Sequence, residues 1–228
     1  MSILKFENIT KAYYQGLPAV SDISFEINEG EFVFLVGPSG SGKSTIIKMI
    51  IRELSPDSGT IYFRDEDISA LDTSRLPDLR RRIGIVFQDF RVLSSKTVFE
   101  NVSVALEVVN ASKREINEVV PNVLNMVRLG DKKDRFPNTL SGGELQRLCI
   151  ARALAHEPDI LLADEPTGMI DPKSAKTVLE ILQKINDLGT TVIMATHDQH
   201  IVNSMKKRVL RIENGSLISD KRRGSYDE

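Results

Sequence analysis

The chain has 228 residues, with 30 basic and 32 acidic side chains and a formal net charge of −2 at pH 7. This length suits one large α/β domain or a core with a smaller subdomain, and the near balance of charge argues against a dedicated nucleic-acid binder. A single cysteine, Cys149, excludes a disulfide framework. Because no apolar stretch approaches the ~20 residues that cross a bilayer and no signal-peptide pattern is present, we expect a cytosolic protein that meets a membrane only through a partner.

The N-terminal part of the chain predicts strands on both sides of a glycine-rich turn. Leu4–Ile9 and Ile23–Ile27 alternate apolar and polar residues, which is typical of antiparallel strands. Phe32–Val36 is continuously apolar, as expected of a strand covered on both faces, and Lys43–Arg52 has the apolar spacing of a helix. Further apolar runs predict strands at residues 59–63, 83–87, 160–163 and 191–195.

Helical patterns occupy the middle of the chain. One runs over Val98–Leu129, with Pro121 in a first turn or at a kink. A second covers Ser141–His156, with its first residue as N-cap, and a third covers Pro172–Leu188, with the preceding aspartate as N-cap. Two short strands around a Glu-Asn-Gly turn predict a terminal hairpin, at residues 208–212 and 216–219.

Strands that alternate with helices indicate an α/β fold with a mostly parallel sheet. We expect a single domain over residues 1–228, in which residues 1–89 and 157–220 form the core, residues 90–156 a helical subdomain and residues 221–228 a polar tail. Basic clusters at residues 80–82, 206–208 and 221–223 are interpreted as solvated surface.

Residues 37–45 read GPSGSGKST directly after a predicted buried strand, which matches the phosphate loop G-x-x-x-x-G-K-[ST] in its expected context. The glycines allow positive φ angles and bring amide N–H groups against phosphate oxygens, and the following helix points its positive dipole end at the same anion. Lys43 can reach the β- and γ-phosphates, and the Ser44 hydroxyl can ligate magnesium. The expected nucleotide contacts are Gly37, Pro38, Ser39, Gly40, Ser41, Gly42, Lys43, Ser44 and Thr45.

Charged residues follow two other predicted core strands. Asp164 and Glu165 end the run that begins at residue 160, where the first acid can order a magnesium ion and the second can polarise an attacking water. The alternative is an exposed Asp-Glu-Pro turn. His197 follows the strand at residues 191–195 and should emerge at the carboxyl edge of the sheet, where ligands bind in such folds. A lone histidine is more often structural, but at this edge it can contact a γ-phosphate or orient water.

A second glycine-containing motif, Leu140-Ser141-Gly142-Gly143-Glu144, directly precedes a predicted helix. Exposed amides at a helix N-terminus form an anion site. Because the first loop already holds the phosphates, an anion site about a hundred residues away would serve a nucleotide bound to another copy. We therefore expect two chains that sandwich two nucleotides head to tail.

Taken together, LSGGE, the phosphate loop and ILLADEP resemble the nucleotide-binding subunits of ABC transporter-type systems, and the resemblance covers nearly the whole chain. It implies an ATP hydrolase of the P-loop NTPase fold that uses ATP and Mg²⁺. The fold would be the ABC type, with a RecA-like mixed or parallel core sheet, N-terminal antiparallel strands and a helical subdomain.

The resemblance also implies roles for single residues. Tyr13 would stack on adenine, although Tyr14 could compete for that role. Gln88 would join the magnesium ion to the partner contact, and Ser44 and Asp164 would complete the magnesium-associated set. The catalytic residues would be Glu165 as base and His197 as switch histidine, while Ser141, Gly142 and Gly143 would grip the other protomer's γ-phosphate and Asp171 would belong to the loop that communicates across the dimer.

Within that superfamily, the segments VFQDFRVL, KTVFENVSVALEV, LLADEPTG, TTVIMATHD and KKRVLRIENG most resemble the FtsE family of bacterial cell-division ATPases. This implies an integral membrane partner of the FtsX type, regulation of peptidoglycan hydrolysis, a position on the inner face of the cell membrane through that partner, and no nucleic acid. The alternative is the ATPase subunit of a lipoprotein-releasing or macrolide-type exporter, which shares nearly all these motifs. Met169-Ile170 stand where the family usually has Asn-Leu.

Overall fold

The structure, a computed structural model, describes residues 1–14 and 17–226, with the side chains of Tyr14 and Leu17 left undescribed. The chain divides into two compact units. Unit 1 comprises residues 1–80 and 189–228, and unit 2 comprises residues 81–188. The last two residues of the expected polar tail, 227 and 228, lie outside the described residues. Within the described ranges, every helix is too short or too polar to span a bilayer.

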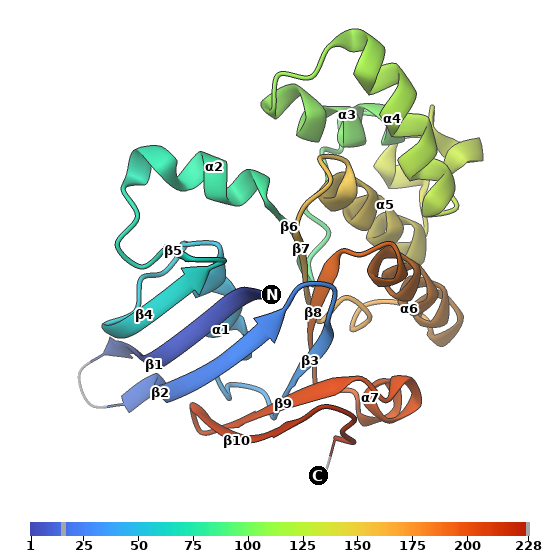
Figure 1. The fold of residues 1–228 in the computed structure, drawn as a ribbon. Helices are drawn as coiled ribbons and strands as arrows, with labels where there is room; N and C mark the ends of the chain where they lie inside the picture. Colours follow the sequence, from blue (N-terminus) through green and yellow to red (C-terminus); the bar gives the residue numbers. More distant parts are fainter. Residues whose placement is uncertain (15–16, 227–228) are drawn as a thin grey trace. The chain divides into compact units, whose positions relative to one another are not determined.

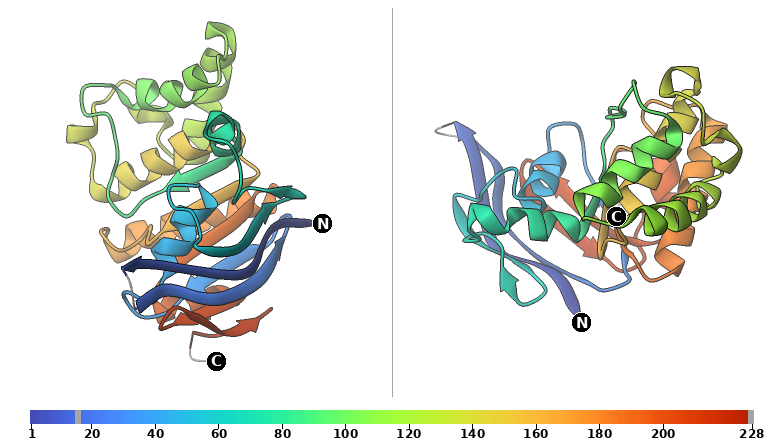
Figure 2. Two further views of the ribbon diagram at one scale, coloured as in Figure 1. Left: turned by 90° about the vertical axis from the view of Figure 1, so that its left-hand side faces the viewer. Right: turned by 90° about the horizontal axis from the view of Figure 1, so that it is seen from above.

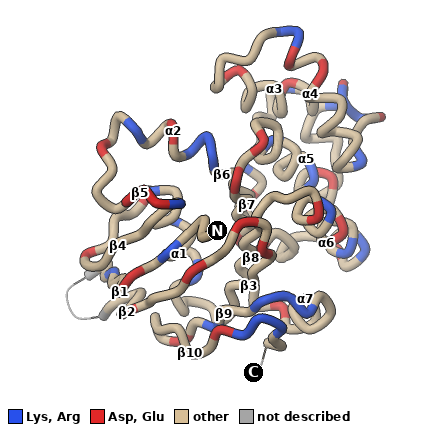
Figure 3. Tube along the Cα trace, viewed as in Figure 1, with Lys and Arg blue, Asp and Glu red and all other residues tan. Residues whose placement is uncertain are grey.

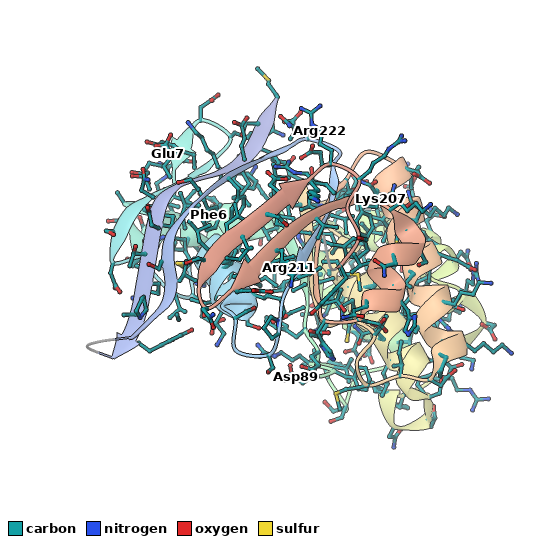
Figure 4. The ribbon with its side chains drawn as sticks, turned by 90° about the horizontal axis from the view of Figure 1, so that it is seen from below. Phe6, Glu7, Asp89, Lys207, Arg211 and Arg222 are labelled. Atoms are coloured by element: carbon teal, nitrogen blue, oxygen red, sulfur yellow. The ribbon has the colours of Figure 1, made fainter. Side chains whose placement is uncertain are left out.

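Unit 1 contains an antiparallel sheet that confirms the predicted N-terminal strands. Its order is β2 (Leu17–Asn28), β1 (Ser2–Tyr14), β4 (Ser58–Phe63) and β5 (Glu66–Asp67). The alternating apolar residues of β1 and β2 bury one face of this sheet. Phe6, labelled in Figure 4, stacks on Phe25 opposite it in register, with ring centroids 4.5 Å apart.

Unit 1 also contains parallel strands on which the phosphate loop is built (Figure 1). The strand β3 (Phe32–Val36) pairs in parallel with β8 (Thr191–Thr196) and with β9 (Arg208–Glu213). All residues of β3 and β8 are buried, which explains the apolar run of β3 and the apolar residues 192–195 of β8. The predicted hairpin is confirmed, because β10 (Ser216–Lys221) runs antiparallel to β9. The helices are α1 (Lys43–Ile50), α2 (Leu76–Arg81, ending in unit 2) and α7 (Gln199–Met205).

Unit 2 pairs two parallel strands with a group of helices, seen from two further sides in Figure 2. The strands are β6 (Ile83–Val86) and β7 (Ile160–Asp164). The helix α5 packs against β6 and against the three other helices of the unit. These helices are α3 (Val98–Val108), α4 (Lys113–Met126), α5 (Gly142–Leu154) and α6 (Pro172–Asp187), and short 3₁₀ turns in the chain span residues 73–75, 130–132 and 137–139.

The structure corrects the prediction of one helical stretch over Val98–Leu129. Asn110 adopts a left-handed φ of 59°, and Ser112 then starts α4 with a capping box. Pro121 consequently lies inside α4 and not in a first turn. The Ser141 and Asp171 N-caps are confirmed. The elements β5, α2 and α7 were not predicted, since each is short and carries little periodic signal.

Candidate functional site

The phosphate loop has the backbone that its glycines predict. Gly37, Gly40 and Gly42 have φ angles of 149°, 78° and 111°, in the region that favours glycine. A Cβ at Gly37 would overlap the carbonyl oxygen of Ile212, whereas one at Gly40 would meet nothing within 4 Å. The loop is therefore packed where it joins the strands and open at Gly40. That combination suits a fixed cradle whose amides face an incoming anion.

Lys43 begins α1, and its side chain folds back over the loop. Its Nζ donates hydrogen bonds to the carbonyl oxygens of Gly37 and Pro38, at 2.8 and 2.9 Å. The residue is only 7% exposed. A buried ammonium held on two carbonyls keeps a positive charge at the loop. Ser44, the next residue, is exposed, so its hydroxyl can be reached from solvent.

Two further predicted site residues lie close to the loop within unit 1. Thr196, the last residue of β8, pairs in register with Val36, the residue before the loop. His197 therefore leaves the sheet at the same carboxyl edge as the loop. Tyr13 is 51% exposed, and its hydroxyl lies 3.1 Å from Oγ1 of Thr45. The competing residue Tyr14 has a side chain outside the described part of the structure.

In unit 2 the predicted acids and glutamine follow two paired strands. Val86 of β6 pairs with Ala163 of β7, so Gln88 and Asp164 both emerge at the carboxyl edge of that pair. Glu165 then turns the chain with a left-handed φ of 49°. For a non-glycine residue this conformation costs about 1 kcal/mol or more and is common at functional sites. The Glu165 carbonyl accepts the Gly168 N–H at 3.1 Å, which closes the turn.

The motif Leu140-Ser141-Gly142-Gly143-Glu144, called the signature motif below, lies at the N-terminus of α5. Ser141 accepts the N–H of Glu144 at its hydroxyl, and the Glu144 carboxylate accepts the Ser141 N–H at 2.9 Å. The other carboxylate oxygen of Glu144 forms an ion pair with Lys132. The ammonium of Lys132 and the Ser141 N–H together lower the pKa of Glu144 to about 2. The carboxylate is therefore ionised at physiological pH.

Gly142 lies beside the segment that precedes α6, and Gly143 lies beside the first turn of α6. Asp171 caps α6 by accepting the backbone N–H groups of Lys173 and Ser174, both at 3.0 Å, and the Ser174 hydroxyl at 2.6 Å. These bonds, above all those from Ser174, lower the pKa of Asp171. The Ser174 side chain lies where a Cβ on Gly143 would be. Asp171 is thereby connected through one serine to the signature motif of the same chain.

This packing predicts that Gly143→Ala is destabilising, by about 1–3 kcal/mol in the free energy of unfolding, because the new methyl group would overlap Ser174. Gly142→Ala is the matched control, since a Cβ there has only ordinary contacts, the nearest being Ile170 at 3.6 Å. Urea unfolding of both variants measures the difference. Equal stability of the two variants would contradict the assigned packing.

The oxygen donors predicted for magnesium are of the type that this ion prefers. Ser44, Gln88 and Asp164 offer a hydroxyl, an amide and a carboxylate. Among residues 1–14 and 17–226, there is no group of three or more His, Cys, Asp or Glu that could hold a metal ion. Magnesium commonly keeps several waters and binds through one or two protein groups plus phosphates. The donor set therefore fits an ion that binds together with a nucleotide.

One residue next to the site, Lys132, was missed by the sequence reasoning. Lys132 lies in a short 3₁₀ turn and gave no periodic signal, so its pairing with Glu144 could not be anticipated. The hydrogen bonds between Glu144 and Ser141, in contrast, are indicated by the capping-box pattern S-x-x-E. Cys149 is buried, and burial raises the pKa of its thiol to about 11.

Two of the three basic clusters come together in unit 1, around the end of α7 and the β9–β10 hairpin (Figures 3 and 4). The Gly224 N–H donates to the Lys207 carbonyl at 3.2 Å. Arg208 departs from the predicted solvated surface. Its side chain is 12% exposed and bonds Glu31 and Asp220, each at 2.7 Å. Arg208 is thus held in structural ion pairs. Lys221, Arg222 and Arg223 are exposed, as expected.

Residues 20–168 match the model of the ABC transporter family. The chain belongs to this family, and it is an ABC-type ATPase subunit. Solved cassettes support the same fold. One is an ATP-binding cassette in a dimeric post-hydrolysis state bound to ADP and Pi, which has a TM-score of 0.87 and 34% identity and covers 97% of this chain and 99% of its own. Another is cbiO1 from Clostridium perfringens, with a TM-score of 0.90, 33% identity and coverage of 97% and 88%.

Two curated relatives of similar length carry the same name. The cell division ATP-binding protein FtsE of Bacillus subtilis is 48% identical over 224 residues, which are 98% of both chains. The protein of the same name from Escherichia coli K12 is 41% identical over 94% of this chain and 97% of its own. The prediction of an FtsE-type ABC ATPase from sequence motifs is confirmed at this level.

Proposed function

We propose that the chain is the ATP-binding and hydrolysing subunit of a bacterial cell-division complex. In this proposal ATP closes two copies of the chain head to tail, and the motion is passed to an integral membrane partner of the FtsX type that regulates peptidoglycan hydrolysis. The observation that carries the proposal is the full-length similarity to FtsE proteins, at 48% identity over 98% of both chains. In this proposal, ATP binding and hydrolysis depend on residues from unit 1 and from unit 2.

The nucleotide would be held mainly by unit 1. Phosphates would bind the amides at Gly40 and the Lys43 ammonium, which the loop carbonyls already orient. Tyr13, exposed and anchored by its hydroxyl at Thr45, would stack on adenine. His197, at the same sheet edge as the loop, would contact the γ-phosphate. Bound Mg²⁺ would neutralise phosphate charge during transfer.

Unit 2 would supply the hydrolytic and dimer-forming groups. Glu165, projected from a turn with positive φ, would accept a proton from the attacking water. Asp164 and Gln88, at the ends of paired strands, would act on the magnesium ion and its water. Ser141, Gly142 and Gly143 would bind the γ-phosphate of the nucleotide held by a second copy, and Asp171 would connect the two copies. Hydrolysis removes the bridging γ-phosphate contact, so the copies part.

A surface of unit 2 supports docking of a membrane partner. Leu93 and Phe136 are large apolar side chains with exposed fractions of 40% and 46%. Both are fixed near the start of α3. The buried amide of Asn101 bonds the Leu93 N–H and carbonyl, at 2.8 and 3.0 Å, and Val98 donates to the carbonyl of Arg135, the neighbour of Phe136, at 2.8 Å. A cytoplasmic element of the partner would cover these side chains and keep the chain on the inner face of the membrane.

Copurification tests this proposal. The Glu165→Gln chain would be recovered from native membranes with Mg-ATP, and bound membrane proteins identified by mass spectrometry. We expect an FtsX-type protein to be enriched over the matched Lys43→Ala chain, which should bind ATP weakly. Recovery of a lipoprotein-releasing or macrolide-type exporter permease alone would contradict the division role and support the alternative.

A further inference from the structure

The fifth residue of the signature motif is an acid, Glu144, and the structure gives it a dedicated cation. One carboxylate oxygen accepts the Ser141 N–H, and the other forms an ion pair with Lys132. The pair is partly buried, with side chains 18% and 34% exposed for Glu144 and Lys132. Lys132 reaches it from the short turn at residues 130–132, outside α5. The charge is therefore neutralised by a residue twelve positions away along the chain.

Helix capping alone does not require this lysine. Three helices of unit 2 begin with the same capping box, and Ser112 with Glu115 starts α4 in the same way. Among the described residues, Glu115 has no ion pair, and only its bonds to Ser112 lower its pKa. The box at α3 has a single exposed lysine, Lys96, at 3.6 Å from Glu100. The close pairing with Lys132 distinguishes the signature helix from the other two.

A bare carboxylate at this position would oppose the role proposed for the motif. Glu144 occupies the first turn of α5, where its carboxylate is bound by the N–H of Ser141. A phosphate that approached the same helix N-terminus would meet this negative charge, and like charges at short range in a partly buried site repel strongly. An ammonium on the far carboxylate oxygen both reduces the repulsion and holds the carboxylate in its capping geometry.

We infer that Lys132 is a positioning residue for the signature motif, which holds and neutralises Glu144 so that the start of α5 can accept the γ-phosphate of a nucleotide bound to the second copy. This inference rests on the proposed function. Lys132 itself touches no nucleotide in this account and acts only through Glu144. Its removal should therefore weaken ATP-driven dimerisation and leave ATP binding to the single chain unchanged.

The test uses the full chain with Glu165→Gln as parent, and measures the Mg-ATP concentration that gives half-maximal dimer. We expect Lys132→Met to raise this concentration about tenfold, in line with the loss of one charge-assisted contact. Lys132→Arg keeps the positive charge, so its half-maximal concentration should stay close to that of the parent. Lys133→Met is the matched control, because Lys133 is the exposed neighbour and has no ion pair among the described residues. Melting temperatures show whether each variant folds, and Lys132→Gln replaces Lys132→Met if that variant does not fold.

A double-mutant cycle separates charge compensation from a merely structural role. In the Glu144→Gln background no carboxylate needs neutralising. Lys132→Met should therefore raise the Mg-ATP concentration for half-maximal dimer by less than about twofold. Provided that the parent dimerises, the inference is overturned if Lys132→Met raises the half-maximal Mg-ATP concentration tenfold in both backgrounds or leaves it unchanged in both. If the parent forms no dimer at any Mg-ATP concentration, the proposed function fails and the inference fails with it.

Discussion

We expect Glu165→Gln to lower kcat for ATP hydrolysis by about 10²- to 10⁴-fold while ATP affinity stays near that of the unmodified chain. Glutamine has nearly the same shape as glutamate but cannot accept a proton from water. The side chain starts from a backbone φ of 49°, directly after the buried strand β7. Phosphate release at saturating Mg-ATP measures kcat, and fluorescent-nucleotide titration measures affinity.

The chain offers a matched control for this substitution. Glu157 is also a glutamate in unit 2 with a left-handed backbone, at φ 52°, and it is exposed in the turn after α5. Glu157→Gln should leave kcat within a factor of about two, since surface substitutions away from special features change little. Undiminished hydrolysis in Glu165→Gln would refute the assignment of Glu165 as the catalytic base.

The second large effect concerns binding. Lys43→Ala should weaken ATP affinity by about 10- to 100-fold, because hydrogen bonds to charged groups contribute about 1.5–3 kcal/mol each. In the structure Lys43 Nζ is fixed at 2.8 Å from the Gly37 carbonyl, so the charge is already in place at the loop. Isothermal titration with Mg-ATP gives the dissociation constant.

Lys48→Ala provides the comparison for Lys43→Ala within the same helix. Lys48 is half-exposed, and its one ion pair among the described residues is a long one, at 3.7 Å, with Glu53. Exposed pairs of this kind contribute at most about 1 kcal/mol to stability. ATP affinity should therefore be unchanged in Lys48→Ala. Equal affinities of the two variants would count against the role given to Lys43.

Sequence reasoning predicted those parts of the fold that depend on local pattern. The strands β3, β7 and β8 were found because four to six consecutive buried residues leave an uninterrupted apolar run. The N-caps Ser141 and Asp171 were found because a side-chain acceptor at a helix start has a recognisable residue type. The break between α3 and α4 was missed, since apolar spacing continues across Asn110 and its left-handed backbone leaves no periodic signal.

Contacts between segments that are distant in the sequence could not be predicted from local pattern. The close approach of Ser174 to Gly143 depends on how α5 packs against α6, and the pairing of Lys132 with Glu144 depends on where a 3₁₀ turn places one ammonium group. Met169 is 59% exposed, and its carbonyl oxygen would lie 3.6 Å from a Cβ on Gly142 of the signature motif. Residue types alone indicated the motifs, whereas the contacts between them arise only from tertiary packing.

The central claim is that ATP joins two copies of this chain, and the most direct test is the mass of the Glu165→Gln chain in solution. Light scattering after size-exclusion chromatography would be run without nucleotide, with Mg-ADP and with saturating Mg-ATP. We predict a mass of twice the 25.5 kDa chain with Mg-ATP alone, and a single chain in the other two conditions. A mass of one chain at saturating Mg-ATP, with ATP bound, would contradict the account.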